Sequence, residues 1–396
     1  MACHVRDAVF NTAQTEVLAE LAHCGHGKPC PYNLRKRQIF KRPQNMLRKS
    51  LVILTLLTCS LFHQAHAATS STRSSGDATW KRRQALFAYN AKAPLNARLV
   101  SRQDTTVSTI ERYTIRGAKG DTVPLLFVMP KVATNARVPV LVVVHGFLGN
   151  IDQMLFVAQI CANNGYASII PEIVAHGARR KNNENLFGGD ADFLYNGMVE
   201  TVGDVRRSID FLETRPRIDR NRIGYLGISL GSILGTMTMA VEPRLKAAGF
   251  VVGGADWKLI IPAFIEAERK RDRQNNRNGA LLRRTQKLLD DIDPKNYAAR
   301  ITPRPMLMIN GRNDTIIPPA SARALYQSAR QPKTLQWLEG GHVLPPIEVA
   351  STLLTWFDRN LKRRPATSRS ATSRIATSRI ATSRIATSRI ATSSTR

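Results

Sequence analysis

A Gly-x-Ser-x-Gly pentapeptide at residues 227–231 places a serine where it could act as a nucleophile. The strand-like run 222–226 precedes the pentapeptide, and the apolar segment 233–240 follows it. A sharp turn from strand to helix needs small residues two positions before and two after the serine, and it lifts the hydroxyl clear of the sheet edge. Because glycine is common, this pattern also arises by chance, so Ser229 needs partners elsewhere in the chain.

A serine hydroxyl is a weak nucleophile at neutral pH. It needs a histidine to accept its proton and a carboxylate to orient that histidine. Five of the eight histidines lie before residue 68, in a segment interpreted below as a leader, and only His342 of the other three follows Ser229. In proteins with a strand-to-helix turn of this kind, the three residues follow one another along the sequence in the order serine, acid, histidine. His342, just after the strand-like run 334–338, is therefore the predicted base.

The predicted acid is Asp314, in the loop after the strand-like run 305–310. Three other carboxylates are alternatives, namely Asp290, Asp291 and Asp293. They precede that strand and would lie at the opposite edge of the sheet, where ordinary solvation explains them.

The apolar run 138–144 predicts a parallel strand buried on both faces, and it ends in His145-Gly146-Phe147. Backbone N–H groups usually stabilise the negative charge of a tetrahedral intermediate. We assign this role to the N–H groups of Phe147 and of Leu230, the residue after the serine. His145 is interpreted as a residue that shapes the loop. His176 is interpreted as a loop histidine with satisfied hydrogen bonds, and a residue that shapes the mouth of the pocket is the alternative.

Four motifs, in this order, resemble the α/β-hydrolase superfamily over residues 113–361: His145-Gly146-Phe147, Gly227 to Gly231, Asn310 to Asp314, and Gly341-His342. Within that superfamily the chain is most similar to the branch of dienelactone hydrolases, acetyl esterases and prolyl-oligopeptidase-related enzymes. This similarity rests on residues 165–172, 176–179, 204–212 and 218–224. Ser232 is a departure, because many relatives have a further glycine there.

The resemblance implies an α/β fold, with a mostly parallel twisted sheet, helices on both faces and a small helical cap. It also implies hydrolysis of short or compact carboxylic esters through an acyl-enzyme, with no metal and no cofactor. The cap candidates are residues 179–203 and 257–293. The runs 112–115 and 123–129 predict a hairpin at the leading edge of the sheet, and residues 76–98 have helical composition.

Five segments are predicted: an extension (1–45), a signal peptide (46–67), an N-terminal segment (68–111), the catalytic domain (112–361) and a tail (362–396). From Met46 the chain has a charged start, twelve mostly apolar residues and an Ala-x-Ala site ending at Ala67. The apolar stretch is too short to span a bilayer. We therefore expect translation to start at Met46 and the enzyme to be secreted or periplasmic.

The net charge of +29 is spread along the whole chain. Residues 1–67 hold nine basic and three acidic residues, and the tail holds nine basic and no acidic ones. Residues 68–361 therefore carry the remaining net charge of +14. The Ala-Thr-Ser-Arg repeats of the tail cannot build a core and predict disorder. The basic surface is interpreted as the ordinary solvated surface of an exported protein, and weak attraction to anionic lipid or envelope polymer is the alternative. Interleaved aromatic residues and recognisable modules for nucleic acid are lacking.

The cysteines predict neither a metal site nor a disulfide. His23, Cys24, His26 and Cys30 imitate a zinc cluster, but a second pair at a recognised spacing is lacking. After cleavage at Ala67, Cys161 alone would remain. Lipidation at Cys59 is a minor alternative to cleavage.

Two functions other than a carboxylesterase stay open at this point. One is a serine peptidase or acylaminoacyl hydrolase of the same fold, although no β-propeller domain that would gate peptides is evident. The other is a catalytically silent protein that binds an envelope partner. The complete set of serine, aspartate and histidine argues against this second alternative. The predicted partner is a small ester, and the oligomeric state stays open.

Overall fold

The computed structural model describes residues 77–132, 137–147, 149–181, 185–187, 191–271, 286 and 288–362. The predicted extension, the signal peptide and the repeats of the tail lie outside the described residues, so their interpretations stay predictions. Within the described ranges, the longest apolar helical stretch falls short of what a membrane crossing requires.

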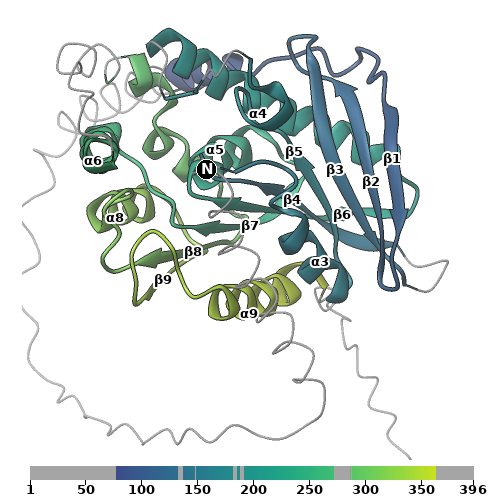
Figure 1. The fold of residues 1–396 in the computed structure, drawn as a ribbon. Coiled ribbons are helices and arrows are strands. Elements are labelled where there is room, and N and C mark those ends of the chain that lie inside the picture. Colours follow the sequence, from purple (N-terminus) through teal and green to yellow (C-terminus); the bar gives the residue numbers. More distant parts are fainter. Residues whose placement is uncertain are drawn as a thin grey trace, which may run out of the picture. The chain divides into compact units, whose positions relative to one another are not determined.

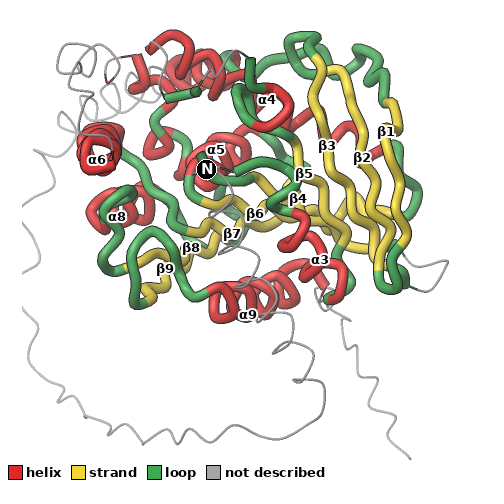
Figure 2. Tube along the Cα trace, viewed as in Figure 1, coloured by secondary structure: helices red, strands yellow, loops and turns green. Residues whose placement is uncertain are grey.

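One sheet of nine strands runs through the described residues (Figures 1 and 2). The strands are β1 (Arg98–Asp104), β2 (Ser108–Arg116), β3 (Thr122–Pro130), β4 (Val138–Val144), β5 (Ala167–Pro171), β6 (Ile218–Ile228), β7 (Leu245–Val251), β8 (Met306–Gly311) and β9 (Lys333–Leu338). Across the sheet they follow the order β1-β2-β3-β5-β4-β6-β7-β8-β9. The pairs from β1 to β5 are antiparallel, and those from β5 to β9 are parallel. The mostly parallel sheet predicted from the sequence is confirmed.

Helices cover both faces of this sheet (Figure 1). The α-helices include α3 (Leu155–Asn163), α4 (Ala191–Glu213), α5 (Leu230–Val241), α6 (Trp257–Arg271), α8 (Pro319–Ser328) and α9 (Pro346–Phe357). Short helical turns are η1 (Gly177–Arg179), η2 (Asp290–Ile292), η3 (Pro294–Asn296), η4 (Ala298–Arg300) and η5 (Asp358–Lys362), and residues 77–85 are helical too. Buried residues of α4, α5 and α8 belong to one hydrophobic core, and those of α3 and α9 to a second.

The central strands bring the predicted motifs to one edge of the sheet. All seven residues of β4 are buried, because helices cover this strand on both sides. In the β4–β6 pair, Val144 lies opposite Gly227, so the two strands end at the same level. Since β8 and β9 run parallel to them, the loops after all four strands meet at the carboxyl edge.

The edge of the sheet differs from the sequence prediction. The hairpin exists as β2 and β3, with Ile115 opposite Val123. However, β1 lies outside this hairpin and forms the edge, within the predicted N-terminal segment 68–111. Every residue of β1 is exposed, so this strand has no alternation of apolar and polar residues to reveal it.

The first candidate cap is also only partly a loop. From residue 191 onward it belongs to α4, whose Leu194, Met198 and Val202 are buried in the core beneath the helix. The second candidate begins with α6, and its residues 272–285 lie outside the described part of the chain. Near its end, Leu289 is fully buried in the core. The prediction of a cap over the site therefore stays a prediction.

Candidate active site

Ser229 sits at the turn from β6 into α5, with φ 54° and ψ −114°. This left-handed backbone conformation is uncommon for a residue with a side chain and marks a strained position. A hydrogen bond from Ser229 N–H to Val251 O, at 2.8 Å, holds the turn. The backbone geometry is the sharp strand-to-helix turn that the pentapeptide predicts.

The two flanking glycines leave no room for a side chain. A Cβ at Gly227 would overlap Gly231 O, and a Cβ at Gly231 would overlap Val144 O on the neighbouring strand. Tyr225 Oη donates a hydrogen bond of 2.7 Å to Gly231 O from the buried side. The close approach of β4, β6 and α5 therefore explains both glycines of the motif.

His342 lies between Ser229 and Asp314. Its Nε2 is 2.9 Å from Ser229 Oγ, and its Nδ1 is 2.8 Å from Asp314 Oδ2. A carboxylate can only accept, so Nδ1 carries the proton and Nε2 is left to accept one from the serine. The Asp314 side chain is fully buried, and its Oδ1 accepts the N–H groups of Ile316 and Ile317 at 2.9 Å each.

Two of the alternative acids have other partners. Asp293 accepts hydrogen bonds from the main-chain N–H groups of Asp256 and Trp257, at 3.0 and 3.1 Å. Asp291 pairs with Arg82 near the protein surface, at 2.5 Å. Asp291 is partly exposed, whereas Asp293 is 1% exposed, so the expectation that ordinary solvation explains these carboxylates is wrong for Asp293.

The two predicted N–H donors lie in segments next to the serine. A Cβ built on Gly146 would be 3.3 Å from Ser229 Cβ, so the loop that continues into Phe147 lies directly against the serine. Leu230 is the first residue of α5, and the N–H groups in the first turn of a helix have no acceptor within the helix. The structure therefore brings together all five residues predicted for the site.

Sequence reasoning missed Glu172, which is 1% exposed and follows β5. Its Oε1 lies 3.0 Å from Nε2 of His145, a histidine that is itself fully buried. An acidic residue directly after a buried parallel strand was the available signal. His176 is buried beside this pair, and burial together with the neighbouring His145 lowers the pKa of its imidazole.

Cys161 lies on α3 and is buried. Burial raises the pKa of its thiol to about 11. Since the thiolate is the reactive form of cysteine, this side chain is inert at neutral pH.

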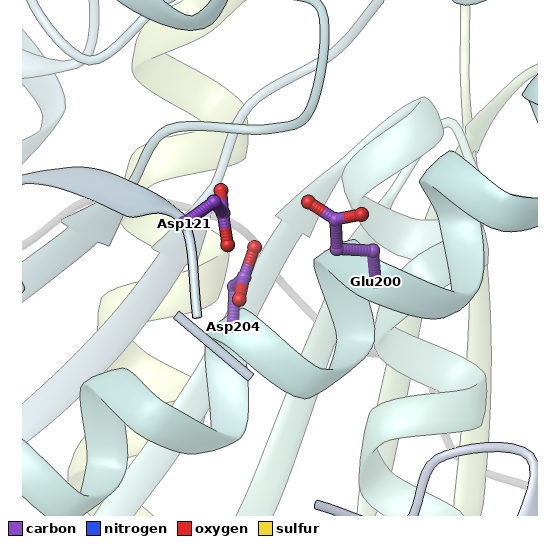
Figure 3. Close-up of side chains that lie close together, drawn as sticks. All are labelled: Asp121, Glu200 and Asp204. Atoms are coloured by element: carbon purple, nitrogen blue, oxygen red, sulfur yellow. The ribbon is translucent and has the colours of Figure 1, made fainter. Parts of the chain in front are cut away.

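An acidic cluster is formed by Asp121, Glu200 and Asp204 (Figure 3). Within the described part of the chain, these are the three side chains close enough together to hold a metal ion. The Arg179 guanidinium pairs with all three carboxylates, at 2.5 to 2.7 Å. One guanidinium therefore already pairs with every member of the cluster, and the ion pairs link the turn before β3, η1 and α4.

Residues 126–336 match the sequence profile of the dienelactone hydrolase family. The chain belongs to this family. As a dienelactone hydrolase family member with the α/β-hydrolase fold, it is a hydrolase, and the similarity predicted from its motifs is confirmed.

This family member is also similar to one relative in sequence and to two esterases in fold. It is 24% identical over 262 residues to the "Putative esterase YitV" of Bacillus subtilis (strain 168), a match over 64% of this chain and 99% of the relative. Its fold is similar to that of an acetyl xylan esterase from Paenibacillus sp. R4. That similarity has a TM-score of 0.57 at 23% identity, over 72% of this chain and 94% of that one. Acetyl xylan esterase 1 from Thermoanaerobacterium sp. JW/SL YS485 is also similar, with a TM-score of 0.55 at 20% identity, over 71% of this chain and 93% of that one.

Proposed function

We propose that this protein is a carboxylesterase that uses Ser229 as a nucleophile and forms an acyl-enzyme. The observation that carries the proposal is the continuous hydrogen-bonded line from Asp314 through His342 to Ser229 Oγ. A serine with its own base and orienting carboxylate is the arrangement that acyl transfer requires. The membership of the dienelactone hydrolase family and the similarity to YitV support an ester as the substrate.

In the first half of the proposed reaction, Ser229 Oγ attacks the ester carbonyl carbon and its proton passes to His342 Nε2. The N–H groups of Phe147 and Leu230 bind the resulting oxyanion. The carbon–oxygen bond to the alcohol then breaks, and the alcohol leaves with the proton from His342. Water next attacks the acyl-enzyme with the same histidine as base, which releases the acid and restores Ser229.

The test is a Ser229→Ala variant assayed with p-nitrophenyl acetate. We expect its turnover to fall to the background rate, and labelling by a fluorophosphonate to disappear. Cys161→Ser is the matched control, because a buried thiol with a raised pKa takes no part in the proposed chemistry. It should keep full labelling. Activity retained in Ser229→Ala would refute the nucleophile assignment.

The same experiment separates the alternatives. A catalytically silent binding protein would not react with the fluorophosphonate in its wild-type form. A peptidase or acylaminoacyl hydrolase would react, but in a panel of acyl chain lengths and peptide substrates it would prefer the amide. We expect compact acyl esters to be turned over fastest.

Export through a signal peptide beginning at Met46 is also part of the proposal. The charged start, the short apolar stretch and the Ala-x-Ala site support it. N-terminal sequencing of the protein from its native cells should yield a first residue of Ala68. Peptides from residues 12–28 in mass spectra of the native protein would contradict the proposed start.

A further inference from the structure

A second buried group of titratable side chains lies behind the loop that contacts Ser229. His145 directly follows β4, while Glu172 and His176 follow β5, and all three are at most 1% exposed. The two imidazole rings lie 5.3 Å apart, measured between ring centroids. None of the three belongs to the line from Asp314 to Ser229, so their burial needs its own explanation.

His145 holds one particular peptide group. Its Nδ1 lies 2.8 Å from Gly146 O, and since a carbonyl only accepts, Nδ1–H is the donor. Gly146 O belongs to the same peptide group as the N–H of Phe147, the proposed oxyanion donor. The N–H of Gly149 binds the same carbonyl at 2.9 Å. Both bonds orient the plane of the peptide group that carries the proposed oxyanion donor.

Glu172 and His176 complete the support of this loop. Glu172 Oε1 lies 3.0 Å from His145 Nε2, the ring nitrogen opposite the one that binds Gly146 O. Both arrangements place a carboxylate on one ring nitrogen of a histidine, but Ser229 donates to His342, whereas Gly146 O accepts from His145. His176 Nε2 lies 2.5 Å from Phe147 O, so an imidazole also contacts the next peptide group.

The loop after β5 is built around the carboxylate of Glu172. Gly177 has φ +46°, and a Cβ there would overlap Glu172 Oε2, so glycine is the residue that fits. Ala175 also has a positive φ, of 59°. Strained backbone of this kind persists where the surrounding contacts require it and is common near functional sites. Arg179 adds a hydrogen bond of 3.0 Å to the main-chain oxygen of Glu172.

We infer that Glu172 and His145 are positioning residues that orient the Gly146–Phe147 peptide group so that its N–H stabilises the oxyanion, and that His176 holds the peptide group that follows it. This inference rests on the proposed function. A hydrogen bond to the carbonyl end of a peptide group polarises the group and strengthens its N–H as a donor. A donor already oriented before the reaction costs no reorganisation when charge develops.

The inference predicts a specific kinetic pattern. The oxyanion exists only after the serine has attacked, so weaker positioning reduces transition-state binding and leaves the ester's ground-state binding unchanged. Loss of a whole oxyanion donor costs about 10²- to 10³-fold in kcat. A donor that stays present but is poorly oriented should therefore cost about 10- to 100-fold, with KM changed less than about threefold.

The test compares two substitutions of His145. The amide nitrogen of His145→Asn takes the place of Nδ1 and still donates to Gly146 O, whereas His145→Leu removes the donor. We expect His145→Leu to lose about 10- to 100-fold in kcat and His145→Asn to recover most of this loss. A trifluoromethyl ketone adds to the serine and forms an oxyanion, so its inhibition constant should rise by the same factor as kcat falls.

Thr201→Val is the matched control. Thr201 Oγ1 accepts the N–H of Val174 at 3.3 Å, in the same loop after β5, and donates to Gly197 O. It touches neither Gly146 nor Phe147 in these hydrogen bonds. We expect its kcat per labelled serine to stay within about twofold of wild type. All rates are normalised to the fraction labelled by fluorophosphonate after long incubation, which removes effects of partial unfolding.

Glu172→Gln keeps the side-chain volume. If His145→Leu does not fold, this variant tests whether the group around His145 positions the oxyanion donor. We expect a drop in kcat of about 5- to 10-fold and a matching rise in the ketone inhibition constant. Unchanged kcat and inhibition constant in the folded variants, or a rise in KM alone, would overturn the inference. A wild-type protein without Ser229-dependent ester turnover would instead refute the proposed function.

Discussion

His342 Nε2 lies 2.9 Å from Ser229 Oγ, although 113 residues separate the two in the chain. Ser229 follows β6 and His342 follows β9, and the strands between them, β7 and β8, are parallel to both. Parallel strands deliver their following loops to one edge of a sheet, where clefts for ligands form. The distance is thus a consequence of the strand order.

Replacing Asp314 by Asn should reduce kcat by about 10³- to 10⁴-fold. The amide keeps the shape of the carboxylate, but it can present an N–H to Nδ1 of His342 and so favour the wrong tautomer. Steady-state kinetics with p-nitrophenyl acetate measure the loss. Asp291→Asn is the control, because that carboxylate pairs with Arg82 near the surface, and its kcat should change by less than twofold. Retention of a tenth of the wild-type kcat in Asp314→Asn would contradict the role.

Gly231→Ala should destabilise the protein by about 1–3 kcal/mol and lower kcat at least tenfold. The new methyl group would overlap Val144 O, so the turn that carries Ser229 must move. Urea unfolding and ester kinetics measure the two effects. Gly165→Ala is the comparison, because Gly165 has φ +73° and a Cβ added there would have no heavy atom within 4 Å. It should cost about 1 kcal/mol from backbone strain and leave kcat unchanged.

Ser232→Ala should lower stability by about 1–2 kcal/mol with little change in kcat. The buried Ser232 Oγ lies 2.8 Å from Gly227 O and 2.9 Å from Val251 O, and so ties α5 to β6 and β7. This explains why a hydroxyl occupies a position where many relatives have glycine. Urea unfolding gives the stability, and a kcat that falls more than fivefold in the folded variant would show that the hydroxyl affects the chemistry.

Asp204 should make the stability depend on pH. Burial raises the pKa of this carboxyl from 3.8 to about 6, against the opposing effect of Arg179. Between these values the folded state binds more protons than the unfolded state, so the free energy of unfolding should decrease as pH rises from about 4 to about 6. The decrease contributed by Asp204 should be about 2–3 kcal/mol.

Asp204→Asn tests this sign, because an amide does not titrate. Urea unfolding at pH 4, 5, 6 and 7 should show that the wild type loses stability relative to the variant as pH rises. A gain relative to the variant over this range would mean that Arg179 stabilises the carboxylate more than burial penalises it.

The sequence determined the local features of this site. The glycines around Ser229, the apolar run of β4 and the glycine after His145 each reflect a constraint within a few residues, so their patterns are readable in the chain. The elimination that left His342 as the predicted base uses the chain order of the three residues, which follows from the strand order.

The tertiary structure alone decided the features that depend on distant partners. The exposed edge strand β1 carries no apolar alternation, so only its pairing with β2 reveals it. Leu194 lies in a segment expected to form a cap, and only the packing of α4 on the sheet shows it in the core. Glu172 is an ordinary acid in the sequence, and its role follows from its contact with His145, 27 residues away. Burial and hydrogen bonding depend on the neighbours in space, which a local pattern does not contain.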